Sequence, residues 1–192
     1  MILPLAYYGN PVLREKGASV EAVTSEIDQL VEDMFETMEG FRGIGLAAHQ
    51  VGKPIQLTVI DIRTAEDRPS TLELGGKEAD PHSIMPIVLI NPSITPLNDP
   101  IQGPEGCLSF PEIFGEISRP DKVRVKALDR HGKPIEFVCS GLLSRAIQHE
   151  ADHLHGVLFI DRMDRATKSG LRDELELLQD KTKSAIANDS AS

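Results

Sequence analysis

One helical segment carries three polar residues on its apolar side, and this feature constrains the chain more than any other. On a helical wheel that turns by about 100° per residue, the apolar arc holds Leu142, Leu143, Ala146, Ile147, His149, Glu150, His153 and Leu154. The opposite arc holds Ser144, Arg145, Gln148, Ala151, Asp152 and His155, and we predict that it faces outward. Burying two imidazoles and a carboxylate without partners would cost several kcal/mol, so the pattern predicts a bound metal ion.

The spacing H-E-x-x-H has a specific chemical use. His149 and His153 are four residues apart, so they lie one above the other on a helix and can both reach one cation, about 2 Å from each ring nitrogen. Glu150 then lies beside the metal and is free to act as a base for a metal-bound water. The alternative is a core helix on which these three side chains make ordinary hydrogen bonds.

A catalytic metal needs further ligands, and the downstream sequence offers only weak candidates. One class of metalloprotease has a third histidine ten residues after the first, where this chain has Phe159, and that class is excluded. Another class uses a glutamate on a later helix, and Glu174 or Glu176 lies at a plausible distance in a charged terminal helix predicted over 171–183. A carboxylate on such a helix is more often a solvated side chain.

The upstream stretch 103–109 offers a better ligand. It places Cys107 in a glycine-flanked turn, where the backbone can bend and approach another group closely. A thiolate is a strong ligand for zinc or ferrous iron, and one cysteine with two histidines leaves a fourth position open for water. An open position implies catalysis, whereas a buried free thiol is the alternative interpretation of Cys107.

A third stretch, 43–50, combines two glycines, small residues and an amide. We predict a tight backbone segment beside which a substrate can lie, with Gln50 offering two N–H donors. The third glycine of a dinucleotide-binding fingerprint is absent, so we reject nucleotide binding. The alternative is a loop that leads into a strand over 55–62.

These three stretches, in this order, resemble the signatures of peptide deformylase. The family motifs G-x-G-L-A-A-x-Q, E-G-C-L-S and Q-H-E-x-D-H match every fixed position at 43–50, 105–109 and 148–153, and the likeness extends from 8–13 to 156–159. The resemblance implies an α+β fold, a single catalytic metal, and removal of the formyl group from the N-terminal formylmethionine of newly synthesised polypeptides.

Carried over by motif, the resemblance implies three metal ligands: Cys107, His149 and His153. Glu150 is then the acid and base, while the Gln50 amide and the Leu108 backbone N–H stabilise charge on the formyl oxygen. Gly45 and the neighbouring backbone hold the peptide as an added strand, and Ile44 lines the cleft with Leu108. Fe²⁺ is the expected native ion, with Zn²⁺, Ni²⁺ or Co²⁺ as alternatives.

Four further positions carry expectations about the surroundings of the site. The resemblance implies an ion pair between Glu105 and Arg119 that braces the cysteine loop, with a weak surface pair as the alternative. Gly103 and Arg145 differ from the commonest bacterial versions, which affects the expected shape and charge of the pocket. Arg145 falls on the outer arc, so plain solvent exposure is the simple interpretation.

Length and charge favour one enzyme domain over 1–192, with 184–192 as a frayed tail. The formal charge of −10, from 20 basic and 30 acidic residues, argues against general nucleic-acid binding. Any contact with the ribosome near its exit site would therefore be local, carried by Lys181 and Lys183 of the terminal helix. The other expected partners are N-formylmethionyl nascent peptides.

The chain has two cysteines, which argues against a disulfide framework and leaves Cys139 as an ordinary thiol at a strand end. The first residues show no charged leader, and no segment approaches the roughly 18 apolar residues of a membrane span. We therefore expect a cytoplasmic protein without membrane contact.

The coarse organisation fits an α+β fold of mostly antiparallel strands around a central metal-binding helix, with a C-terminal helix. We expect a helix after Thr24 and Ser25, strands over 55–62 and 87–91, and a hairpin of strands over 122–128 and 134–139. A polar segment over 64–83 remains unassigned.

Two competing functions remain open. A metallopeptidase of another class would not need Cys107, and a non-enzymatic module would close all four metal positions with protein ligands. Neither explains Gln50.

Overall fold

A seven-stranded antiparallel sheet forms the main layer of the protein, whose computed structural model describes residues 1–191. Its strands follow one another in the order β1 (Gly45–Ala47), β2 (Leu57–Ile60), β5 (Ile87–Pro96), β8 (Lys122–Leu128), β9 (Pro134–Ser140), β3 (Ser70–Leu74) and β4 (Lys77–Ala79). The strand β1 lies at one edge of this sheet. A second, two-stranded sheet pairs β6 (Pro100–Cys107) with β7 (Phe110–Pro120).

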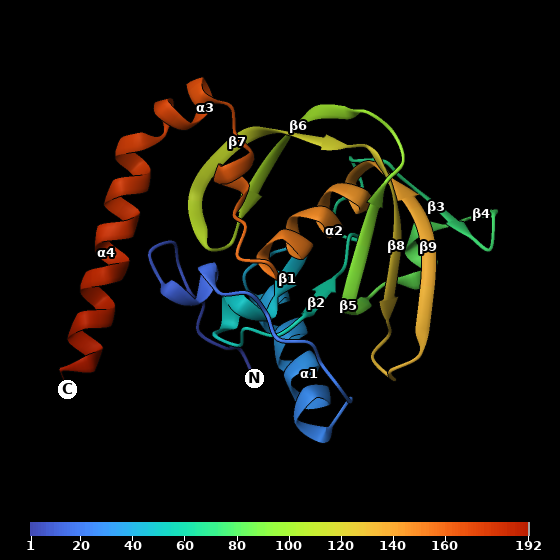
Figure 1. Ribbon diagram of the computed structural model, residues 1–192, viewed down its shortest axis with the longest axis horizontal. Coiled ribbons are helices and arrows are strands. Elements are labelled where there is room, and N and C mark those ends of the chain that lie inside the picture. Colours follow the sequence, from blue (N-terminus) through green and yellow to red (C-terminus); the bar gives the residue numbers. More distant parts are fainter. Residues whose placement is uncertain (192) are drawn as a thin grey trace.

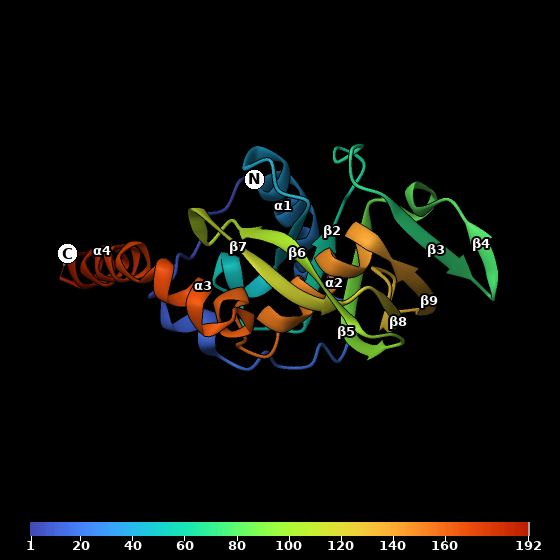
Figure 2. The ribbon, with the colours of Figure 1, turned by 90° about the horizontal axis from the view of Figure 1, so that it is seen from above.

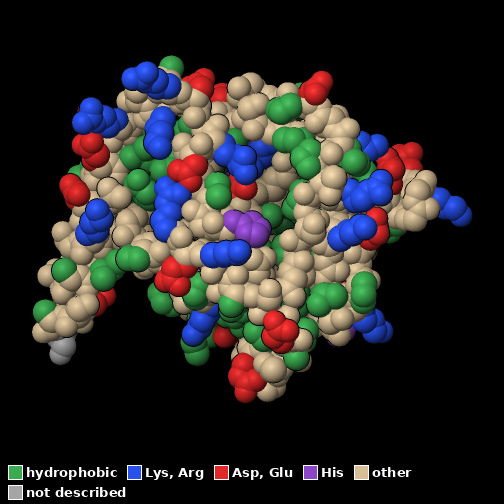
Figure 3. All heavy atoms as spheres, in the orientation of Figure 1, with side chains coloured by type: hydrophobic (Ala, Val, Ile, Leu, Met, Phe, Trp, Pro, Cys, Tyr) green, Lys and Arg blue, Asp and Glu red, His purple; other side chains and the backbone are tan. Residues whose placement is uncertain are grey.

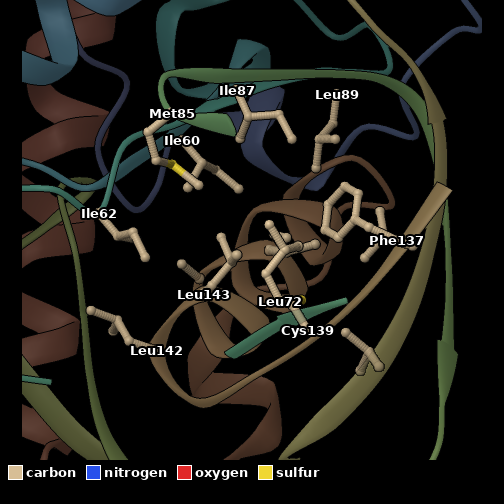
Figure 4. Packing of buried hydrophobic residues seen from close by; sticks show 14 of the residues in the cluster. Ile60, Ile62, Leu72, Met85, Ile87, Leu89, Phe137, Cys139, Leu142 and Leu143 are labelled. Atoms are coloured by element: carbon tan, nitrogen blue, oxygen red, sulfur yellow. The ribbon is translucent and has the colours of Figure 1, made fainter. Parts of the chain in front are cut away.

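Helix α2 (Gly141–His153) lies at the centre, between the large sheet and the β6–β7 pair (Figure 1). Leu143 lies beside Leu72 of the large sheet, and Leu142 lies on the side of Ile62, all within one apolar cluster that also holds Phe137 (Figure 4). Leu143 is fully buried, and truncating a core leucine to alanine typically costs about 2–5 kcal/mol. Apolar packing therefore fixes the position of the helix that carries H-E-x-x-H.

The prediction that one arc of α2 faces outward is wrong. Ser144 is fully buried, and Arg145 and Gln148 are only 8% and 9% exposed. The β6–β7 sheet covers this side of the helix, and the polar groups there have hydrogen-bond partners, such as the Pro120 carbonyl that accepts from Gln148 Nε2 at 2.8 Å. The polar character of these residues suggested that they are exposed. They can be buried because their polar groups form hydrogen bonds inside the protein.

The start of α2 depends on a glycine. Gly141 has a φ of +71°, and a Cβ there would lie 2.2 Å from the Pro69 carbonyl oxygen. That carbonyl accepts from the Leu142 N–H at 3.1 Å, and the Ser70 hydroxyl accepts from the Leu143 N–H at 2.9 Å. The last loop residue before β3 and the first residue of β3 thus satisfy N–H groups at the beginning of the metal-binding helix.

The remaining helices lie around this centre. Helix α1 (Ser25–Gly40) begins as predicted, with the Thr24 hydroxyl accepting from the Ile27 N–H at 3.3 Å. Short α3 (Arg165–Gly170) leads to α4 (Arg172–Ser190), which stands at the side of the molecule (Figures 1 and 2). Single 3₁₀ turns are η1 (Pro11–Arg14), η2 (Ala48–Val51), η3 (Pro81–Ile84) and η4 (Phe159–Arg162).

The expected α+β fold is confirmed, with several differences in its elements. The predicted hairpin is present as β8 and β9, while β2 is shorter and β5 longer than predicted. The segment 64–83 contains β3, β4 and η3, and the expected loop over 43–50 contains β1 and η2. Helix α4 continues to Ser190 where a frayed tail was expected, and Ser192 lies outside the described residues. Among residues 1–191, no helix has the length and apolar character to cross a membrane.

Candidate active site

Cys107, His149 and His153 lie together, as predicted. Cys107 is the last residue of β6, and both histidines project from α2. Their possible ligand atoms all lie within 4.8 Å of one another, with Cys107 Sγ 3.4 Å from His153 Nε2. Among residues 1–191, no fourth His, Cys, Asp or Glu side chain joins this group, and Glu174 is exposed on α4. A non-catalytic metal closed by four such side chains is therefore not supported.

The donor set fits a metal ion. The Nδ1–H of His149 donates to Glu105 Oε1 at 2.9 Å, so its Nε2 is left with the lone pair that a metal requires. His153 presents Nε2 toward the cysteine sulfur, and its buried Nδ1 has no hydrogen-bond partner among the described residues. One thiolate and two imidazoles suit zinc or ferrous iron, and three protein ligands leave one position open.

The two imidazoles differ in their electrostatic surroundings. Burial lowers the pKa of His153, and the neighbouring His149 lowers it further. Burial also acts to lower the pKa of His149, but its hydrogen bonds with Cys107 and Glu105 outweigh this and raise that pKa. Glu105 therefore orients the His149 ring and favours a proton on Nδ1.

Glu150 lies in the cleft beside this group, on the same turn of α2. It is 5% exposed, and its Oε2 atom has no hydrogen-bond partner among residues 1–191. Burial raises the pKa of Glu150 to about 7. A Cβ at Gly45 would lie 2.6 Å from Glu150 Oε1, so glycine is what lets β1 approach this carboxyl. A carboxyl with a pKa near neutrality can both accept and return a proton.

The amide of Gln50 is held from both ends on η2. Its Oε1 accepts from the Ala47 N–H at 2.9 Å, and its Nε2 donates to the Ser109 hydroxyl at 3.1 Å. The same Nε2 lies 3.5 Å from Cys107 Sγ. These bonds fix the orientation of the amide and place its donors beside the candidate metal ligands.

Leu108 follows Cys107 in the turn between β6 and β7, and it is half-buried. A Cβ at Gly43 would lie 2.7 Å from Leu108 Cδ1, so the two segments are in close contact. Both residues line the same cleft as Ile44 and Gly45. The structure therefore brings all the predicted site residues of the three motifs to one place.

Glu105 is the centre of a buried charge network behind the ligands. Arg119 donates to both of its oxygens, at 2.6 and 2.9 Å, so the predicted ion pair is confirmed and is buried rather than on the surface. Arg145 Nη1 donates to Glu105 Oε2 at 2.9 Å. Burial alone would raise the pKa of Glu105, but hydrogen bonds with His149 and Arg119 lower it to about 2. Glu105 is therefore a carboxylate at neutral pH.

The sequence did not predict the role of Arg145 in this network. Besides Glu105, its guanidinium donates to the carbonyls of Ile117 at 2.8 Å and Ile101 at 3.1 Å. A Cβ at Gly103 would lie 2.8 Å from Arg145 Cζ, so the two unusual positions noted in the sequence are in contact.

The network continues from Arg119 to the surface. Arg119 Nη1 donates to Asp152 Oδ2 at 2.8 Å, and Arg162 donates to both Asp152 oxygens at 2.6 and 2.7 Å. Phe159, which stands where another class has its third histidine, packs on His149 with ring centroids 5.8 Å apart. Asp152 on the outer arc is therefore part of this network and is partly buried, whereas His155 is exposed, as predicted for that arc.

Two of the candidate ligands, Cys107 and His149, line a cleft of about 580 Å³. One wall comes from 41–45, another from β6 and β7, and α2 forms the floor. The cleft is large enough for a few residues of an extended peptide, since small-ligand pockets are commonly about 300–1,000 Å³.

Comparison with known proteins agrees with this geometry. A sequence profile of the polypeptide deformylase family matches residues 2–169. The chain is 46% identical to a peptide deformylase of Opitutus terrae over 96% of this chain and 97% of that protein. It is 44% identical to one of Methylacidiphilum infernorum over 93% and 94% of the two chains. The crystal structure of a plant peptide deformylase is similar with a TM-score of 0.83 at 36% identity, covering 96% of this chain and 93% of that one.

Proposed function

Because the chain belongs to the polypeptide deformylase family and is an enzyme that removes the formyl group from N-terminal methionine, we propose that the reaction takes place in the cleft at Cys107, His149 and His153. The observation that carries this proposal is the convergence of one sulfur and two imidazoles beside a buried carboxyl. We propose further that the chain forms one catalytic domain. The comparisons give no support to a metallopeptidase of another class.

We propose that the three side chains hold one divalent ion, with Fe²⁺ as the native metal and Zn²⁺, Ni²⁺ or Co²⁺ as substitutes. When bound there, such an ion supplies a Lewis acid that lowers the pKa of a coordinated water. The protein contributes the orientation of the ligands, because Glu105 holds His149 from behind and Arg119 and Arg145 hold Glu105.

Glu150 is the proposed proton carrier. Its carboxylate form accepts a proton from the attacking water, and its acid form returns that proton to the amine as the C–N bond of the formamide breaks. The pKa of about 7 supports both steps, and the burial of Glu150, which is 5% exposed, is the cause of that raised pKa.

Gln50 and Leu108 are the proposed donors to the formyl oxygen. Negative charge develops on this oxygen during attack, and two fixed N–H groups would stabilise it without reorganisation. The Ala47 and Ser109 partners hold the Gln50 amide in place, and the Leu108 N–H is carried by the turn directly after Cys107.

The peptide is proposed to add to the free edge of β1. Gly45 lies at this edge next to Glu150, and Ile44 lines the cleft beside it. Backbone hydrogen bonds along such an edge hold an extended peptide regardless of its side chains. This arrangement suits an enzyme whose substrates share only a formylated methionine.

Two finer proposals concern the setting of the enzyme. We propose a cytoplasmic location, because Cys107 must stay reduced and neither cysteine of the chain is paired. We also propose a local ribosome contact through Lys181 and Lys183, which are exposed on α4. Basic and acidic side chains are interspersed on the face shown in Figure 3, including the protruding helix, so this contact would be confined to a few side chains.

One experiment tests the central proposal. Protein purified without oxygen should contain about one equivalent of a divalent metal and should hydrolyse a formyl-Met peptide. Cys107→Ala should lose both the metal and the activity, while Cys139→Ala, which changes the thiol outside the site, should keep both. A Cys107→Ala protein that still holds its metal would show that the sulfur is not a ligand.

A further inference from the structure

Two arginines at the mouth of the cleft form no ion pair within the described part of the chain. Arg42 lies just after the end of α1, and Arg68 lies in the loop before β3. Both side chains are exposed and line the cleft. Among residues 1–191, neither guanidinium takes part in an ion pair or a side-chain hydrogen bond, although Arg63 in the same loop is paired with Asp61 at 2.6 Å. We call Arg42 and Arg68 the cationic mouth.

The other charges of the cleft do not neutralise the cationic mouth. Glu105 and Arg145 pair with each other, and Glu150 lies at the floor. Glu112, exposed on β7, is the remaining acidic residue of the lining. The mouth therefore presents two cations against one carboxylate, on a chain whose formal charge is −10. This local excess is opposite in sign to the molecule as a whole.

The distance from the reacting group identifies which part of a peptide would meet these charges. Gly45 lies against Glu150, and Arg42 precedes it by three residues, which span at most about 10 Å. An extended peptide advances about 3.3 Å per residue. With its formyl group beside Glu150, an extended peptide that runs from Gly45 toward Arg42 therefore reaches the level of Arg42 by its third residue.

Apolar groups border the same region. Phe41 is 40% exposed beside Arg42, and Phe114 is 68% exposed on the facing wall, where its ring covers Gly106. A Cβ at Gly106 would lie 2.7 Å from this ring.

We propose that the cationic mouth selects formyl-Met peptides with an acidic side chain at the third residue. The inference rests on the proposed function, because the register of the peptide is set by the formyl group at Glu150. The carboxylate lies between Arg42 and Arg68, and a lysine at the same peptide position is repelled. Selection would act on kcat/KM through binding, with no part in the bond-breaking step.

The test compares three peptide amides, formyl-Met-Ala-Xaa-Ala-NH₂, with Glu, Gln or Lys as Xaa. We expect kcat/KM for Glu to exceed that for its neutral isostere Gln by about 3- to 10-fold, and that for Lys to be lower than Gln. Added salt should reduce these ratios, because exposed charges are screened over about 10 Å at 0.1 M ionic strength. The Gln peptide also reports the basal reaction, so failure of the proposed function would appear as no hydrolysis of any peptide.

The variants separate this mouth from a general charge effect. Arg42→Glu should invert the Glu-to-Lys ratio, Arg68→Gln should reduce it, and Glu112→Gln should increase it. Arg63→Gln is the matched control, since Arg63 is in the same loop but does not line the cleft. Its ratio and its basal rate should equal those of the wild type.

Three results would overturn the proposal. The first is equal kcat/KM for the Glu and Gln peptides in the wild type. The second is a ratio that changes as much in Arg63→Gln as in the Arg42 variant. The third concerns the source of the carboxylate. The kcat/KM of formyl-Met-Ala-Gln with a free C-terminal carboxylate could exceed that of its amide, while Glu gives no higher kcat/KM than Gln among the amides. The cationic mouth would then recognise the C-terminal end of a peptide, and the assignment to a side chain would be wrong.

Discussion

Burial determines the protonation of Glu150. The carboxyl is enclosed by α2, β1 and the ligands, and the loss of water raises its pKa to about 7. An exposed glutamate has a pKa near 4.3, which is more than two pH units lower, and its carboxylate would therefore be a weaker base. The same side chain at the surface would therefore be less suited to the exchange of protons that the reaction requires.

Replacing Glu150 with glutamine should abolish this proton transfer, while the bound metal is retained. Gln fills the same space against Gly45 but cannot accept a proton, so kcat/KM on a formyl-Met peptide should fall by about 10²- to 10⁴-fold. Metal content, measured on the same sample, should stay near the wild-type value. Glu116→Gln, at an exposed carboxylate of β7 outside the cleft, is the control and should keep full activity. Full activity of Glu150→Gln would assign the proton transfer to another group.

The two cysteines should differ sharply in reactivity. Cys139 is fully buried in β9, and burial raises the pKa of its thiol to about 12, so its reactive thiolate is scarce at ordinary pH. Cys107 is partly exposed and opens onto the cleft. In chelator-treated protein we expect an alkylating reagent to modify Cys107 alone, as located by peptide mass. Metal bound at the site should protect Cys107 from the reagent. Equal alkylation of Cys107 in metal-loaded and chelator-treated protein would contradict its role as a thiolate ligand.

At this scale the sequence was informative where chemistry depends on spacing. His149, Glu150 and His153 could be identified because one helical turn brings them to one side, whatever else surrounds the helix. The buried role of Arg145 could not be identified in this way, because it depends on four hydrogen-bond partners contributed by β6 and β7. Pairings between segments distant in sequence leave no periodic pattern.

Among the elements, β6 and β7 have the greatest effect on the site and were not predicted. Their glycines and prolines, such as Gly103 and Pro104, are poor strand formers, and the sequence pattern indicated a turn. The strands form because they pair with each other over their length and cover the polar side of α2. The hairpin of β8 and β9, by contrast, has regular alternation and was predicted with almost the right bounds.

Gly103 should be coupled to Arg145 across these elements. An alanine at Gly103 would place its Cβ 2.8 Å from Arg145 Cζ and displace a guanidinium that bonds to Glu105 and Ile117. We expect Gly103→Ala to lower the free energy of unfolding by about 1–3 kcal/mol, since hydrogen bonds of a buried charge are lost. Urea unfolding of the single and double variants gives the measurement.

In an Arg145→Ala background the same glycine substitution should be nearly neutral, because the clash is gone. The coupling in such a double-mutant cycle should reach about 0.5–3 kcal/mol. If the losses in the free energy of unfolding of the two single variants simply add in the double variant, Gly103 is required for the strand β6 itself and not for the packing of Arg145.

For the whole molecule, the charge network links global stability to pH. Glu105 joins β6 to Arg119 of β7 and Arg145 of α2, so its ionisation affects the packing of both layers. Its pKa is lowered from the ordinary 4.5 to about 2, although burial opposes the shift. A carboxyl with a lowered pKa stabilises the folded state above its unfolded pKa, and this contribution is lost as the pH falls toward the folded value.

We therefore expect the contribution of Glu105 to the stability of the metal-free protein, on the order of 3 kcal/mol, to be fully present above about pH 4.5 and to be lost as the pH falls from about 4.5 to 2. Glu105→Gln should be less stable at neutral pH, because Arg119 and Arg145 keep their charge and lose its partner. Its stability should also depend less on pH in the acid window. Urea midpoints across that window, with chelator present throughout, measure both effects, and Glu116→Gln should follow the wild type. Parallel acid profiles for Glu105→Gln and the wild type would place the acid-sensitive group elsewhere in the protein.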